Sequence, residues 1–188
     1  MLGEARLGVL ITSGPGGLTA THLPFIFDAE RQRLKGHLAR GNPQPMGGAV
    51  DALVVFQGIE AYVSPGFYPS KAVHGRAVPT WNYEAVHVHG RAQFIEDPVW
   101  LRENVSTLAT RFEADRPSPW RLEDAPPDYV ERLLSGIVGV QIEIERIEAK
   151  RKLSQNKDHA DRVGVVQGLE GTGAPGDAAV ARAMRALG

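Results

Sequence analysis

The sequence predicts a mainly antiparallel β fold, a barrel or a sandwich, with helices between and after the strands. Two observations support this. Short apolar or alternating segments recur along the chain, and turns rich in glycine and proline, such as residues 13–17, separate them. This pattern is typical of antiparallel sheets with short connections, whereas a doubly wound parallel sheet alternates its strands with helices.

The first half of the chain is predicted to consist mostly of strands. The predicted strands are residues 7–12, 18–27, 33–39, 53–56 and 59–64. The first two form a hairpin across the turn at 13–17. A turn at Gln57-Gly58 separates the last two, and residues 53–56 are continuously apolar, as expected of a strand buried on both faces.

Two later segments alternate between apolar and polar residues. Residues 86–94 place valine, alanine and phenylalanine on one face, and residues 138–145 do the same with valine and isoleucine. Both are therefore predicted to be half-buried strands. The block at 79–83, just before the first of them, is predicted to be a loop.

Helices are predicted between and after these two strands. Asp97-Pro98 is a typical helix start, an N-cap followed by proline at the first position. The apolar stripe of this helix is Leu101, Val105, Leu108 and Phe112. A shorter helix covers 127–134 and ends at Gly136, and another begins after Asp158.

The end of the chain predicts a separate segment. Residues 171–176 are expected to be a flexible linker. The amphipathic helix that follows carries Val180, Met184 and Leu187, so it needs a partner surface, on the barrel or on a second subunit. We therefore predict one domain over residues 1–170, and a linker with a C-terminal helix over 171–188.

Composition limits the possible functions. The 188 residues include no cysteine, which excludes disulfides, thiolate catalysis and metal sites with sulfur ligands. The formal net charge is −1, so the charge gives no positive support for nucleic-acid binding. No apolar run approaches the roughly 20 residues needed to span a bilayer. We expect a cytoplasmic protein without a signal peptide or membrane contact.

Three polar blocks are candidates for a binding site. Residues 79–83 combine tryptophan and tyrosine with a hydroxyl and an amide, while residues 36–44 and 150–156 mix cations with amides. Aromatic faces can cover a planar ligand and a few polar groups can orient it, so the blocks predict a pocket for a flat, anionic cofactor. Taken singly, each block could equally be a turn-rich connection with solvated charges.

Other chemistries receive less support. His87 and His89 lie on one strand face, but no third metal ligand has a matching spacing, so a polar strand face is the better interpretation and no metal is expected. The sequence has no phosphate-binding glycine loop and no nucleophile elbow. The basic run at 150–152 is most simply a solvated face. No residue stands out as catalytic.

Five segments in order resemble a known family. They are ATHLPF (20–25), GHLARGNPQ (36–44), AYVSPGFYPSK (61–71), VPTWNYEAVHVHG (78–90) and KLSQN (152–156). The likeness runs from about residue 7 to residue 168, and the family is the PaiB-type FMN-binding negative transcriptional regulators. It implies a split β-barrel of the pyridoxamine-phosphate-oxidase-like type that works as a homodimer with FMN at the subunit interface.

The resemblance also implies which residues bind FMN. Near the phosphate or the ribityl chain it places His37, Arg40 and Asn42. Further polar contacts come from Ser64, Tyr68 and Lys71. Thr80, Trp81 and Asn82 approach the flavin, and Ser154 and Gln155 close the site. Members of the family usually begin with a further segment, so we expect either a truncated start or a missing lid.

Three functions stay open at this point. The first is an FMN-binding regulator, for which DNA is a partner by resemblance alone. The second is a flavin-dependent oxidoreductase acting on a small substrate. The third is a flavin- or haem-handling interaction module without turnover. The residues support a cofactor site but identify neither a reaction nor a DNA-binding element.

Overall fold

The computed structural model describes residues 6–44 and 48–187, which form two compact units. Unit 1 comprises Met1–Phe56 and His87–Glu148, and unit 2 comprises Gln57–Val86 and Ala149–Gly188. The expectation about the start of the chain concerns residues 1–5, which lie outside the described residues.

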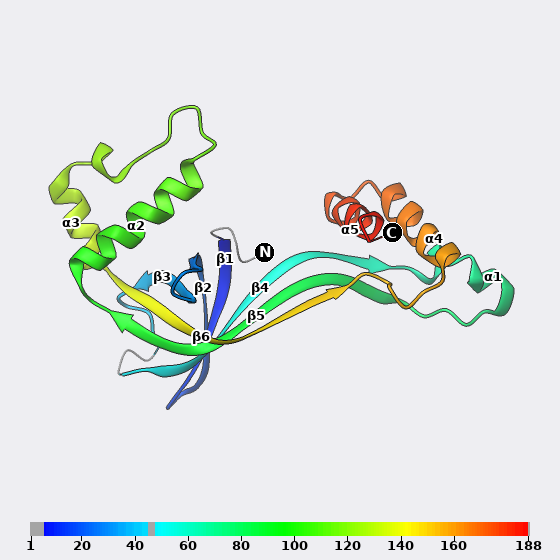
Figure 1. Cartoon of the computed structure of the whole chain (residues 1–188), viewed down its shortest axis with the longest axis horizontal. Helices are drawn as coiled ribbons and strands as arrows, with labels where there is room; N and C mark the ends of the chain where they lie inside the picture. Colours follow the sequence, from blue (N-terminus) through cyan, green and yellow to red (C-terminus); the bar gives the residue numbers. More distant parts are fainter. Residues whose placement is uncertain (1–5, 45–47, 188) are drawn as a thin grey trace. The chain divides into compact units, whose positions relative to one another are not determined.

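Six antiparallel strands with flanking helices confirm the predicted fold class (Figure 1). The strands are β1 (Arg6–Gly14), β2 (Gly17–Asp28), β3 (Arg33–Ala39), β4 (Val50–Val63), β5 (Thr80–Ile95) and β6 (Ile137–Lys152). The helices are η1 (Pro65–Phe67), α1 (Ser70–His74), α2 (Pro98–Glu113), η2 (Leu122–Asp124), α3 (Pro127–Ser135), α4 (His159–Gly171) and α5 (Pro175–Arg185). The strand order is that of a closed barrel, β1-β2-β3-β6-β5-β4.

The barrel core lies in unit 1. β1 and β2 form the predicted hairpin, with Gly14 opposite Gly17, and β3 pairs with β6 from Arg33 opposite Glu143 onward. The alternation of the strands turns their apolar residues inward, where the rings of Phe25 and Phe56 meet edge to face at 5.9 Å. Other fully buried core residues are Leu10, Val54, Val88, Val138, Val140 and Ile142.

Helices α2 and α3 and the short η2 add a smaller apolar cluster to unit 1. As predicted, Asp97 caps α2, because its carboxylate accepts a hydrogen bond from the amide of Trp100 at 2.7 Å. The cluster is formed by Leu101, Leu122, Val130 and Leu134. Phe112 was expected in the buried stripe of α2 but is 49% exposed, because it lies in the last turn of the helix.

Unit 2 has its own apolar core. The unit contains residues 57–63 of β4, 80–86 of β5 and 149–152 of β6 together with η1, α1, α4 and α5. Its core is formed by residues of β4, α4 and α5, with Tyr68 and Leu153. Figure 1 shows α4 and α5 side by side, and Val180 and Met184 of α5 are buried in the cluster that they share with α4. The partner surface for the last helix is therefore inside the unit. Only residues 172–174 connect the two helices, and the predicted domain boundary between residues 170 and 171 lies at the last residue of α4.

Two predictions of local structure were wrong. β4 is one strand over 14 residues, with no turn at Gln57-Gly58. The buried residues of β4 are even-numbered up to Phe56 and odd-numbered from Ala61 onward, so the strand changes its buried face near residue 58. In the sequence, this interruption of the alternating pattern looks like a turn between two strands. β5 begins at Thr80, so the block predicted as a loop is mostly strand. Aromatic and β-branched residues favour this conformation.

No helix within residues 6–44 and 48–187 has the length and the apolar character needed to cross a bilayer.

We predict that Gly90→Ala destabilises the barrel by about 3 kcal/mol, at the upper end for an overpacked core. A Cβ atom at Gly90 would lie 1.9 Å from the carbonyl oxygen of Glu143, so two backbones would have to separate. Gly41→Ala is the matched control, because its Cβ would meet no atom within 4 Å. Urea unfolding followed by circular dichroism measures both variants, and equal stabilities would contradict the prediction.

Candidate functional site

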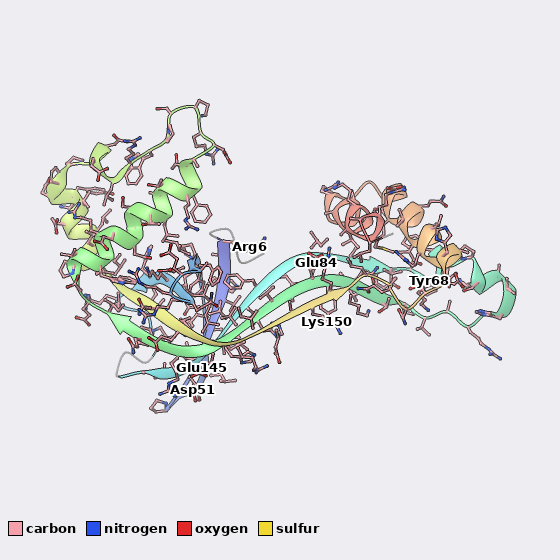
Figure 2. The ribbon with its side chains drawn as sticks, in the orientation of Figure 1. Arg6, Asp51, Tyr68, Glu84, Glu145 and Lys150 are labelled. Carbon is pink, nitrogen blue, oxygen red and sulfur yellow. The ribbon has the colours of Figure 1, made fainter. Side chains whose placement is uncertain are left out.

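Unit 2 contains a small cavity, of about 180 Å³, that is lined mostly by polar side chains. It is lined by Tyr68, Val78, Thr80, Asn82, Lys152, Ser154, Asn156 and Lys157. These residues come from the start of β5, the end of β6 with the turn that follows it, and the segment between η1 and α1, where Figure 2 labels Tyr68. The structure therefore brings together four of the predicted site residues, namely Tyr68, Thr80, Asn82 and Ser154.

A reciprocal pair of hydrogen bonds forms the wall of this cavity. The amide nitrogen of Asn82 donates to the Ser154 hydroxyl at 3.0 Å, and that hydroxyl donates to the amide oxygen of Asn82 at 3.1 Å. Asn82 is completely buried, so these bonds satisfy polar groups that water cannot reach. Ser154 has a φ of 61°, a left-handed conformation that costs energy in a residue other than glycine.

The turn that carries Ser154 is held from both sides. The Gln155 side chain accepts from the amide of Leu153 and donates to the carbonyl of Arg151, each at 2.7 Å. The amide of Lys157 donates to the carbonyl of Ser154 at 3.0 Å. Gln155 was predicted to close a cofactor site, and in the structure it shapes the turn that positions its neighbours.

Two ammonium groups lie at the cavity. The ammonium group of Lys152 donates to the hydroxyl of Thr80 and to the carbonyl oxygen of Trp81. The ammonium group of Lys157 lies 4.9 Å from the centre of the Tyr68 ring, at cation–π distance. Neither lysine forms a salt bridge among the described residues, although Lys157 is close enough to Asp161 to help lower the pKa of that carboxyl.

The hydroxyl of Tyr68 is buried and, within the part of the chain that the structure describes, has no hydrogen-bond partner. Burial raises the pKa of Tyr68, the interaction of its hydroxyl with the Ser154 side chain partly opposes this rise, and the nearby carboxylate of Asp161 adds to it. The phenol therefore stays neutral at physiological pH and can donate. A buried polar group without a partner is costly, so this atom is a position where a ligand group would be stabilising.

The cavity thus offers two cations, two hydroxyls, two side-chain amides and one unpartnered phenol in a small volume. This set suits an anion that carries hydroxyl groups, since ammonium groups attract the charge and the neutral donors fix its orientation. No carboxylate lines the cavity itself, although the charge of Asp161 reaches Tyr68 and Lys157 in its wall.

The other predicted residues of unit 2 lie outside this cavity lining. The Ser64 hydroxyl accepts from the amide of Gly66 and caps η1. Lys71 lies on α1, where it lines a surface hollow beside α4. Trp81 contacts Lys152 only through its carbonyl oxygen. Its side chain points to the opposite face of β5 from the buried side chain of Asn82, because neighbouring residues of a strand alternate between the faces. The Trp81 side chain is 52% exposed and meets Tyr62 edge to face at 5.9 Å.

The predicted residues of unit 1 are engaged in local contacts. Arg40 donates to the carbonyls of Ser135 and Ile137 and pairs with Glu96 at 3.3 Å. Asn42 donates to the hydroxyl of Thr21 at 2.9 Å and accepts from the amide of Gln44. These contacts fasten the end of β3 to the end of α3 and to β2. They leave fewer free donors on Arg40 and Asn42 than the sequence alone implies.

His37 has a different environment. It lies beside a largely apolar cavity of about 290 Å³ under α2, η2 and α3, and its ring is 3.5 Å from the amide nitrogen of Asn104. Burial lowers the pKa of His37, so the imidazole is neutral at pH 7. A neutral imidazole in apolar surroundings offers a phosphate no positive charge.

Sequence reasoning missed four residues of the unit 2 cavity, namely Val78, Lys152, Asn156 and Lys157. The signal was present, because Lys152 and Asn156 belong to the KLSQN segment and Lys157 follows it. The basic run was interpreted as a solvated face, but Arg151 pairs with Glu84 at 2.6 Å and Lys152 lines the cavity. His89 contacts Glu148 at 3.2 Å, and no cluster of three metal-ligating side chains occurs among the described residues.

We predict that Asn82 and Ser154 are energetically coupled. Asn82→Ala leaves the buried Ser154 hydroxyl without a partner and should lower the free energy of unfolding by about 2–3 kcal/mol. Adding Ser154→Ala should then cost less than it does alone, by about 1–2 kcal/mol. A double-mutant cycle from urea unfolding measures this coupling, and additive effects would argue against the pair.

We also predict that acid destabilises unit 1 through His37. Its folded pKa lies below that of the unfolded chain, so the stabilisation is complete above about pH 6.5 and is lost as the pH falls below that value. The free energy of unfolding should decrease between pH 7.5 and pH 5.5, and His37→Gln should show a smaller decrease. The same decrease in both proteins would mean that His37 is not responsible.

Comparison with known proteins gives a consistent result. The sequence model of a family described as "Putative FMN-binding domain" matches residues 1–146. The chain is 37% identical over 171 residues to "Protease synthase and sporulation protein PAI 2" of Bacillus subtilis, covering 89% of this chain and 80% of that protein. It is 31% identical to an uncharacterised protein of Emericella nidulans over all of this chain and 91% of that one.

Solved structures share the fold at low sequence identity. The "FAD and Heme binding protein" from Mycobacterium smegmatis has a TM-score of 0.60 at 15% identity, covering 86% of this chain and 73% of that one. The "Flavocytochrome Anf3" from Azotobacter vinelandii has a TM-score of 0.56 at 13% identity, covering 86% and 69%. At these identities the likeness concerns the fold alone, which is a split barrel. The relatives and the family model together show that this chain belongs to the PaiB-type family of FMN-binding split-barrel proteins, and that its cofactor is FMN.

Proposed function

We propose that the cavity of unit 2 binds the phosphate and ribityl end of FMN, and that the FMN-bound protein is a negative regulator of transcription. The observation that carries the binding proposal is the placement of two cations and a buried, unpartnered phenol at one cavity. The observation behind the regulatory role is the 37% identity to a protein whose name refers to protease synthesis and sporulation.

The residues of the cavity fit this end of FMN. Lys152 and Lys157 would hold the phosphate charge, and the hydroxyl of Thr80 and the amide of Asn156 would bind the phosphate oxygens and the ribityl hydroxyls. Asn82 and Ser154, whose donors are engaged with each other and with Met184, would keep the wall of the cavity in place. The Tyr68 hydroxyl would gain the partner that it lacks. The remaining predicted contacts, His37, Arg40, Asn42, Ser64, Lys71, Trp81 and Gln155, stay predictions.

The size of the cavity supports a shared site. Pockets for drug-sized ligands measure roughly 300–1,000 Å³, and this cavity measures about 180 Å³. It has room for part of FMN, so the isoalloxazine ring needs another wall. We therefore propose a homodimer in which the second subunit completes the site. Light scattering on the FMN-bound protein should give twice the mass of the chain, and a monomer that retains FMN would contradict this arrangement.

The regulatory role has a direct test. FMN-bound protein is used to select duplexes from a random-sequence DNA pool, and the affinity for an enriched sequence is measured at several salt concentrations. A regulator that contacts DNA should enrich a defined sequence and lose affinity steeply with salt. Because the net charge is −1, unspecific attraction gives little background. A pool without enrichment would contradict regulation by direct DNA contact.

The second candidate function is a flavin-dependent oxidoreductase. The titles of two structures that share the fold, a FAD- and haem-binding protein and a flavocytochrome, favour it. Bound FMN would supply electron transfer, and the chain would bind it and exclude water. Anaerobic addition of NADH or NADPH should then bleach the flavin band near 450 nm, and air should restore it. A flavin that is not bleached would exclude these two reductants.

We predict that Lys152→Gln and Lys157→Gln each weaken FMN binding at least tenfold, because each removes a charge that faces the phosphate. Lys150→Gln is the matched control, since Lys150 is an exposed lysine of β6 that does not line the cavity, and it should bind FMN like the parent protein. Quenching of flavin fluorescence measures the affinities. Equal weakening in all three variants would indicate unspecific attraction instead of a phosphate site.

Tyr68→Phe separates binding from stability. The phenol has no partner in the described structure, so its removal should leave the free energy of unfolding unchanged or slightly higher, while FMN binding weakens. Unchanged FMN affinity in a stable Tyr68→Phe protein would exclude the phenol as a ligand contact.

A further inference from the structure

A second cavity in unit 2 lies between α4 and α5 and measures about 280 Å³. It is lined by His159, Arg162, Val163, Val166, Gln167, Met184 and Arg185. Five of these residues follow the spacing i, i+3, i+4, i+7 and i+8 along α4, so they form one face of that helix. Neither the family nor the proposed FMN site accounts for a cavity here.

The two arginines of this cavity are in different electrostatic states. Arg185 donates to both carboxylate oxygens of Glu170, at 3.0 and 2.8 Å, and this pairing lowers the pKa of Glu170. Arg162 pairs with no carboxylate among residues 6–44 and 48–187, and its Nε atom is buried without a hydrogen-bond partner. The charge of Arg185 is therefore compensated, whereas that of Arg162 is not.

Apart from His159, the rest of the lining is apolar or an uncharged amide. Met184 is 2% exposed and Val166 is 7% exposed, and together with Val163 they form an apolar surface beside the guanidinium group. Gln167 adds one amide. An inorganic anion would leave the apolar surface in contact with water, and a neutral apolar molecule would leave Arg162 uncompensated.

We propose that the cavity between α4 and α5 binds a small organic carboxylate with an apolar body. Arg162 holds the head, because a guanidinium group matches a carboxylate with two parallel hydrogen bonds. Val166 and Met184 contact the body. The volume is slightly below the range of drug-sized pockets, roughly 300–1,000 Å³, which suits a ligand of metabolite size.

Met184 connects this site to the cavity proposed for FMN. Its sulfur accepts a hydrogen bond from the amide nitrogen of Asn82 at 3.3 Å, and Asn82 lines that other cavity. A ligand that contacts Met184 therefore changes the surroundings of Asn82, which is hydrogen-bonded to Ser154. Met184 is also a convenient reporter, because the chain has only three methionines and their labelled methyl groups give three signals.

The test is a titration of the full chain, labelled with ¹³C at the methionine methyl groups, with hexanoate as the probe. Met184→Leu assigns the Met184 signal. We expect hexanoate to shift this signal along a saturable curve, while 1-hexanol and inorganic phosphate at equal concentrations leave it in place. Hexanol has the same apolar body without the charge, and phosphate has charge without the body, so only the proposed chemistry fulfils both conditions.

Variants then locate the head of the ligand. Arg162→Gln should weaken hexanoate binding at least tenfold. Arg182→Gln is the matched control, because Arg182 is an exposed arginine of α5 outside the cavity lining, and it should bind like the parent protein. The proposal is overturned if hexanoate causes no shift, if hexanol or phosphate shifts the signal equally, or if the two arginine variants behave alike. The comparison of the three probes on the parent protein decides the question even if Arg162→Gln fails to fold.

Discussion

The buried pairing of Asn82 with Ser154 is the interaction on which the candidate site depends. It joins the start of β5 to the turn after β6, two segments 72 residues apart, at a position that water does not reach. Ser154 has a left-handed backbone, and such a conformation persists only where the surroundings enforce it. The hydrogen bonds of Asn82 and Gln155 supply that enforcement, and the turn they hold places Asn156 and Lys157 at the cavity.

The charges around this turn follow from the same geometry. Arg151 and Lys152 are adjacent in β6 but have different partners. Arg151 forms an ion pair with Glu84, whereas Lys152 contacts only a hydroxyl and a carbonyl. Within the basic run, the charge of Arg151 is thus paired with Glu84, while Lys152 lines the cavity. A count of charges along the sequence cannot make this distinction, because it depends on which groups of β5 lie opposite each cation.

Part of this structure could be predicted from the sequence, and the reasons are physical. The strand alternation, the Asp97 and Asp158 caps and the end of α3 at Gly136 depend on neighbouring residues, and they were predicted correctly. The continuity of β4 could not be predicted, because its two halves are buried in the cores of different units. The KLSQN segment and the block at 80–82 were both identified, but their meeting through Asn82 and Ser154 depends on long-range pairing. The local engagement of Arg40 likewise depends on carbonyl groups 95 residues away.

The unpartnered groups of unit 2 are a stronger guide to function than its polar composition. Most polar side chains in the unit satisfy one another, as Ser70 does with Asp161 and Arg185 with Glu170. Two buried atoms among the described residues of this unit do not, the Tyr68 hydroxyl and the Arg162 Nε, and each belongs to a residue that lines a separate cavity. Folding alone would favour their replacement by apolar groups, because an unsatisfied buried donor costs stability. A ligand that supplies the missing acceptor removes that cost, and Met184 links the two cavities, because it lines one and contacts Asn82 in the wall of the other.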